Sequence, residues 1–67
     1  MQFNERLKEL RNDAGLSQKK LAELIGASQK AIDFWEKGIN EPKASYIIAL
    51  AKFFNVSCDY LLGIVDD

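Results

Sequence analysis

The apolar residues of this chain recur at the spacing that is typical of amphipathic helices. The first stripe consists of Phe3, Leu7, Leu10 and Ala14, whose separations are four, three and four residues. Gly15 follows this stripe and is expected to end the helix. No segment shows the sustained alternation of apolar and polar residues that marks a strand. The pattern therefore predicts an all-α chain.

Four further helices are predicted, and small polar residues and glycines mark their ends. Serine is a favoured N-cap residue, and glycine is common just after the last helical turn. We expect helices over residues 18–25, 29–37 and 58–62, each preceded by a serine and followed by a glycine. A fourth apolar stripe runs from Ile47 to Phe54. The second predicted helix carries, on or near its apolar face, Leu21, Ala22, Leu24 and Ile25.

The third predicted helix has a chemically rich outer face. A helix turns by about 100° per residue, so Ile32 and Trp35 are expected to face the core, with Glu36 at the border. The residues expected to face outward are Gln29, Lys30, Asp33, Phe34 and Lys37. A glutamine amide can pair with adenine, a lysine can reach guanine or a phosphate, and a phenyl ring can contact the thymine methyl group. A polar outer face is also what any helix on a protein surface requires.

Length and composition exclude several classes of protein. A chain of 67 residues suits one domain, with the bounds 1–67. Its single cysteine cannot form an internal disulfide, and the lack of histidine argues against a metal site. These absences also argue against an enzyme, and we expect no cofactor. The longest apolar run, residues 46–51, is too short to cross a membrane. A chain without disulfides suits the reducing cytoplasm.

Short motifs follow one another along the chain in a recognisable order. They are Arg6, Lys8 and Arg11, then Gly15-Leu16-Ser17-Gln18, Leu21-Ala22, Gly26, Ser28, Ile32, Trp35-Glu36-Lys37-Gly38, Pro42, Val56-Ser57 and Asp59-Tyr60-Leu61-Leu62-Gly63. In this order and spacing, the chain resembles the Cro/phage-repressor (XRE-type) helix-turn-helix family. The resemblance implies a compact five-helix bundle, the lambda-repressor-like DNA-binding domain, with the helix-turn-helix motif at about residues 18–37. It also implies a sequence-specific DNA-binding transcriptional regulator, acting as a repressor, that reads the major groove with the third helix.

The resemblance assigns roles to individual side chains. Gln29, Lys30 and Phe34 occupy base-reading positions on the helix that would enter the major groove. Asp33 lies near them, and it would either accept a hydrogen bond from a cytosine amino group or remain a solvated charge. Contacts to the DNA backbone are expected from Ser17, Gln18, Lys19, Lys20, Ser28, Lys37, Asn40 and Lys43. A structural ion pair between the first and third helices is expected from Arg11 and Glu36.

One module of this size makes few base contacts, so the expected partner is a second copy. A homodimer on a pseudo-palindromic double-stranded operator would supply two half-sites. Phe53, Tyr60 and Ile64 could form the dimer patch. Two alternatives stay open: Tyr60 and Ile64 cover the small core, or the chain begins a longer protein whose linker starts at Gly63. The alternative function is a protein-interaction or antitoxin-type module that uses the same fold, with DNA binding secondary.

The distribution of charge changes what the net charge implies. A net charge of −1 argues mildly against nucleic acid as a partner. Residues 1–30 carry six basic and four acidic side chains, a net of +2, whereas residues 31–67 carry three and six, a net of −3. The basic excess therefore lies where the resemblance places phosphates. We expect weak non-specific DNA binding and a large share of the affinity from specific contacts.

Overall fold

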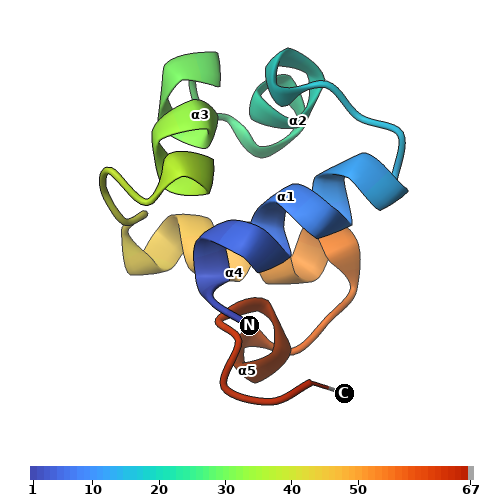
Figure 1. The fold of residues 1–67 in the computed structure, drawn as a ribbon. Helices are drawn as coiled ribbons and strands as arrows, with labels where there is room; N and C mark the ends of the chain where they lie inside the picture. The colour runs from blue at the N-terminus through green and yellow to red at the C-terminus, as the bar shows by residue number, and fades with distance from the viewer. Residues whose placement is uncertain (67) are drawn as a thin grey trace.

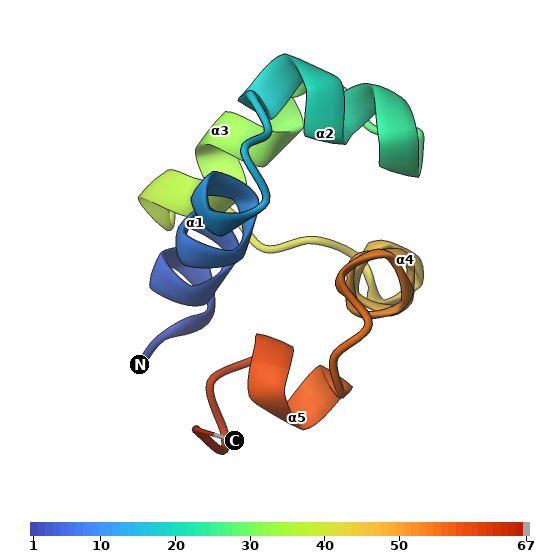
Figure 2. The same cartoon turned by 90° about the vertical axis from the view of Figure 1, so that its right-hand side faces the viewer.

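The computed structural model describes residues 1–66, which form five helices and no strand (Figure 1). The helices are α1 (Phe3–Asp13), α2 (Gln18–Ile25), α3 (Gln29–Lys37), α4 (Ala44–Phe54) and α5 (Cys58–Leu61). In both views, α2 and α3 lie together at one end of the molecule, and α5 lies at the opposite end with α1 and α4 between them (Figures 1 and 2). The all-α prediction is confirmed, and α2 and α3 have the predicted bounds.

The core forms where one apolar residue from each helix meets the others. Leu7, Leu21, Ile32, Leu50 and Leu61 come from the five helices in order, and each has 0 % exposure. Complete burial of such a side chain stabilises the folded state by about 1.5–3 kcal/mol. Every helix is therefore anchored in the same cluster, which leaves the outer face of each helix available for other contacts.

Three apolar residues of the predicted helices lie outside the core. Ala14 is exposed, because α1 ends at Asp13 and the chain turns away at Gly15, whose φ is 71°. Leu62 lies outside α5 and is 38 % exposed. Leu24 is 48 % exposed, because the rotation of about 100° per residue carries it to the edge of the buried face of α2. Spacing alone does not separate the centre of an apolar face from its edge.

The beginning of the chain packs against the helix that comes last. Arg6 is 3 % exposed, and its guanidinium carbon lies 3.7 Å from the centre of the Tyr60 ring. Arg6 Nη2 also lies 3.4 Å from a carboxylate oxygen of Asp66. A guanidinium on an aromatic face keeps a favourable electrostatic contact while it loses water. The backbone of Met1 runs so close to Gly63 that a Cβ atom there would overlap the Met1 carbonyl.

Candidate nucleic-acid interface

Local hydrogen bonds fix the connection between α2 and α3. The Ser17 hydroxyl oxygen accepts a hydrogen bond of 3.0 Å from the backbone N–H of Lys20 and begins α2. This helix ends at Gly26, whose φ of 76° is the left-handed conformation that glycine adopts at little cost. The Ser28 hydroxyl oxygen accepts a hydrogen bond of 3.0 Å from the N–H of Ala31 and begins α3. Each serine keeps its hydroxyl proton for an external acceptor.

α3 has one buried face and one accessible face. Ile32 and Trp35 point into the core with 0 % and 4 % exposure, as predicted. Gln29 and Lys30 are exposed in the first turn, and Phe34 is half-buried one turn later. The Lys30 ammonium lies 5.4 Å from the centre of the Phe34 ring, within the range of a cation–π contact. The three side chains that we expect to read bases therefore lie on one helix, where solvent reaches them.

A bidentate ion pair joins α1 to the end of α3. Arg11 donates from Nε to Glu36 Oε2 at 2.6 Å and from Nη2 to Glu36 Oε1 at 2.9 Å. Its Nη1 donates to the Leu16 carbonyl at 2.8 Å, just before α2. The hydrogen bonds to Glu36 raise the pKa of the Arg11 guanidinium, against a smaller opposing effect of burial. The structure thus brings together the two residues that the sequence suggested as a pair, and the pair holds α3 against α1.

The same polar network continues from Glu36 over the surface of α3. The Gln18 side-chain amide donates to Asp33 Oδ1 at 3.1 Å and to Glu36 Oε1 at 3.2 Å. Asp33 Oδ2 lies 2.9 Å from the Lys37 ammonium. The hydrogen bond from Lys37, followed by that from Gln18, lowers the pKa of Asp33, which therefore stays ionised. Both carboxylate oxygens of Asp33 have partners within the protein.

Beyond the Arg11–Glu36 pair, one contact of this network has a signal in the sequence. Asp33 and Lys37 are four residues apart, and residues at that spacing are neighbours on a helix surface. The contacts of Gln18 depend on how α2 crosses α3, which no local pattern encodes. The Gln18 amide donates to two carboxylates in this structure, and its expected contact with the DNA backbone stays a prediction.

The other candidates for backbone contacts lie at the start of α2 and in the loop after α3. Lys19, Lys20, Asn40 and Lys43 are all exposed. Lys20 lies 4.0 Å from Glu23, whereas Lys19 and Lys43 have no carboxylate of residues 1–66 within that distance. Two lysines in the first turn of α2 oppose the helix dipole, so an anion bound at that end would be favourable. These cations are therefore open to a polyanion.

The predicted dimer patch is only partly exposed. Ile64 and Phe53 are 68 % and 40 % exposed. Tyr60 is half-buried, with its ring against the Arg6 guanidinium, and neither Tyr60 nor Ile64 belongs to the apolar cluster of the core. Two further exposed apolar side chains in the second half of the chain are Ile48 and Val65.

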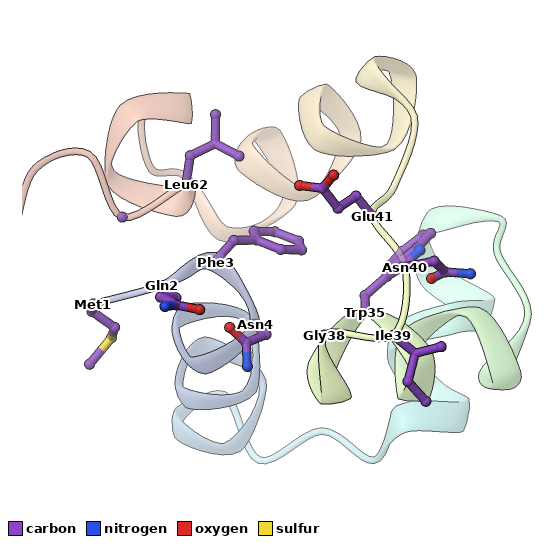
Figure 3. A pocket seen from close by; sticks show the side chains of 11 residues that line it. Met1, Gln2, Phe3, Asn4, Trp35, Gly38, Ile39, Asn40, Glu41 and Leu62 are labelled. Carbon is purple, nitrogen blue, oxygen red and sulfur yellow. The ribbon is translucent and has the colours of Figure 1, made fainter.

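A cavity of about 930 Å³ lies between the start of α1, the loop after α3 and the end of α5 (Figure 3). The Phe3 ring points into it, and the Glu41 carboxylate reaches in from the loop.

Within residues 1–66, no three His, Cys, Asp or Glu side chains gather into a possible metal site. In the same part of the chain, no helix has the length and apolar character to cross a membrane.

Two helices, α2 and α3, joined by a short turn at Gly26, with one face of α3 accessible, define a helix-turn-helix domain. A model of the Helix-turn-helix family matches residues 7–61 of this chain, and the chain belongs to that family, in its XRE-type branch. The resemblance drawn from the sequence motifs is therefore confirmed.

Two relatives and one solved structure illustrate the similarity. The HTH-type transcriptional activator BcrR of Enterococcus faecalis is 42 % identical over 94 % of this chain and 31 % of its own length. The HTH-type transcriptional regulator ImmR of Bacillus subtilis is 36 % identical over 94 % of this chain and 50 % of its own length. The chain thus spans half or less of these two relatives. The c2 repressor of Salmonella phage P22, solved in complex with a synthetic operator, superposes with a TM-score of 0.87 and 34 % identity, covering 92 % of this chain and 94 % of that chain. The five-helix fold is confirmed.

Proposed function

We propose that this chain is a sequence-specific DNA-binding transcriptional regulator that acts as a repressor. The observation that carries the proposal is the accessible face of α3 with Gln29, Lys30 and Phe34. An α-helix fits the major groove of B-DNA, which is about 12 Å wide. Membership of the helix-turn-helix family supports the proposal, as does the similarity to a repressor that was solved with its operator.

In this mechanism, the first turns of α3 enter the groove and read base edges. Gln29 pairs with adenine, Lys30 donates to guanine or to a phosphate, and Phe34 contacts a thymine methyl group. Asp33 keeps a lone pair on each oxygen and accepts from a cytosine amino group. Phosphates on either side are held by Ser17, Lys19, Lys20, Ser28, Asn40 and Lys43. Gln18 and Lys37 are engaged with carboxylates in the free chain, so they reach a phosphate only when those contacts open. The regulator bound to its operator then excludes polymerase from the same stretch of DNA.

The test begins with selection of bound duplexes from a random library, followed by a footprint on the selected site. Gln29→Ala should weaken binding to that site by about 1–3 kcal/mol and relax the preference at one base pair. Asn12→Ala removes an exposed amide from α1 and is the control, which should bind as the unsubstituted chain does. If Gln29→Ala and Lys30→Ala both keep the affinity and the sequence preference, α3 is not the reading helix.

We further propose that the regulator is a cytoplasmic homodimer on a pseudo-palindromic operator. Exposed Ile64 and Phe53 support this proposal, because a two-fold contact needs an apolar patch on the surface. Ile64→Asp should shift sedimentation toward the monomer and weaken binding to a site with two half-sites. Ile39→Asp changes an isoleucine that is 60 % exposed in the loop after α3, and it should leave the dimer intact. Equal effects of the two substitutions would contradict the patch.

The second candidate function is a protein-interaction or antitoxin-type module. It is favoured by exposed apolar side chains outside α3, among them Leu24 on α2 and Ile39 in the loop after α3, and by the acidic second half of the chain. A specific protein partner, together with no salt-dependent binding to any duplex, would favour this function over the first.

A further inference from the structure

Lys37 is the lysine of the proposed interface that a carboxylate holds most closely, since the other paired lysine, Lys20, lies 4.0 Å from Glu23. The Lys37 ammonium lies 2.9 Å from Asp33 Oδ2. Lys19, Lys30 and Lys43 have no carboxylate of residues 1–66 within 4.0 Å. The end of α3 therefore carries a cation and an anion side by side, whereas the start of α2 and the start of α3 carry free cations.

The position of the Asp33 carboxylate is set from a second helix. Its other oxygen, Oδ1, accepts a hydrogen bond of 3.1 Å from the Gln18 amide, and Gln18 is in turn bonded to Glu36. The Asp33 side chain is 29 % exposed, whereas that of Lys37 is 60 % exposed. The anion is thus the more enclosed member of the pair, held from two helices, and the lysine is the more exposed one. A phosphate that approaches Lys37 must compete with that carboxylate.

We propose, on the basis of the DNA-binding function proposed above, that Asp33 is a specificity-determining residue that occupies Lys37 and so weakens binding to non-specific duplexes. Non-specific binding derives almost all its free energy from neutralised phosphates, so the loss of one phosphate contact affects it fully. At the cognate site, base contacts by Gln29, Lys30 and Phe34 carry part of the affinity. A cytosine amino group can donate a hydrogen bond to the Asp33 carboxylate there and so offset its repulsion of the DNA. The residue therefore widens the gap between cognate and random DNA.

The experiment measures dissociation constants against salt for two duplexes, the selected site and a random sequence. Asp33→Asn keeps the shape of the side chain and removes its charge. It should steepen the non-specific salt slope by about 0.9, the value of one added phosphate contact. If the variant and the unsubstituted chain bind random DNA equally at ~1 M salt, this steeper slope makes the variant bind about eightfold more tightly at ~0.1 M salt. Cognate binding should tighten by a smaller factor, so the ratio of the two affinities should fall.

Two further variants separate pairing from the overall change in charge. Glu9→Gln removes an exposed acid from α1 and should leave the non-specific slope unchanged. Lys37→Gln should change the slope little in the unsubstituted chain, where Asp33 already occupies the lysine. In the Asp33→Asn background, Lys37→Gln should remove the whole gain of about 0.9 in slope. Thermal melts check that every variant is folded.

The outcomes are distinguishable. A non-additive effect of Asp33→Asn and Lys37→Gln on the slope supports the proposal, together with a lower specificity ratio. Additive effects, an unchanged ratio, or an equal effect of Glu9→Gln would overturn it and leave the proposed function standing. If the unsubstituted chain shows no salt-dependent binding to either duplex, the proposed function fails and this inference fails with it.

Discussion

The ion pair between Arg11 and Glu36 is the polar contact whose removal should be most damaging to the fold. The side chains of Arg11 and Glu36 are 10 % and 4 % exposed, and two hydrogen bonds of 2.6 and 2.9 Å join them. Removing one partner of a buried pair costs about 3–5 kcal/mol, because the other charge stays buried without compensation. After Glu36→Met, Arg11 keeps the Leu16 carbonyl. We therefore expect the lower end, about 3 kcal/mol.

A loss of this size is large for so small a chain. At ~0.05–0.15 kcal/mol per residue, the whole free energy of unfolding is about 3–10 kcal/mol. A loss of about 3 kcal/mol corresponds to a fall in Tm of roughly 12–24 °C, at ~4–8 °C per kcal/mol for a domain of this size. Trp35, the sole tryptophan, is buried beside the Tyr46 ring, so its fluorescence reports urea unfolding directly.

Two controls decide whether burial is the cause. Glu23→Met breaks a pair at 4.0 Å in which both side chains are 57 % exposed, and it should cost less than about 0.5 kcal/mol. Arg11→Met combined with Glu36→Met removes both charges, so it should recover much of the loss, because buried pairs are often replaceable by apolar side chains of similar size. Burial is not the cause if Glu36→Met costs no more than Glu23→Met, or if the double variant loses the sum of its single variants.

Two more predictions concern Gly63, in the turn after α5, and the stability of the fold at low pH. Gly63→Ala should destabilise the chain by at least about 1 kcal/mol more than Gly15→Ala, as measured by urea unfolding. Both glycines have positive φ, 80° and 71°, but only Gly63 would place a Cβ against Met1; equal costs would contradict that contact. Because Lys37 keeps the pKa of Asp33 below its ordinary 3.8, their contact stabilises the fold above that pH and is lost as the pH falls below it. Asp33→Asn should flatten the acid limb of a stability–pH curve, and an unchanged limb would argue against the contact.

Much of the fold could be predicted because its signals are local. The bounds of α2 and α3 follow from Ser17 and Ser28, whose hydroxyls cap the helices, and from Gly26 and Gly38, which both take positive φ. The accessible face of α3 follows from helical rotation alone. The base-reading and phosphate-binding roles remain predictions, because they depend on a duplex as well as on the chain.

The features that the sequence did not reveal join residues from different helices. Arg6 sits beside the first apolar stripe and reads as a surface charge, yet it is buried under the ring of Tyr60, far away in the sequence. Gln18 reads as a helix-start residue, yet it bridges Asp33 and Glu36. Such contacts depend on the angles at which helices cross, and helical periodicity carries no information about those angles.

The packing of α1 against α5 has a consequence for the order in which the chain folds during synthesis. Roughly 45 residues separate the end of α1 from the start of α5, so at ~5–20 residues per second the ribosome needs about 2–9 s to make them. During that interval Arg6 cannot contact the Tyr60 ring, and the Met1 backbone cannot pack against Gly63. Of the five helices, α1 is made first and is among the last to reach its final environment, and the native core closes only when α5 has been made.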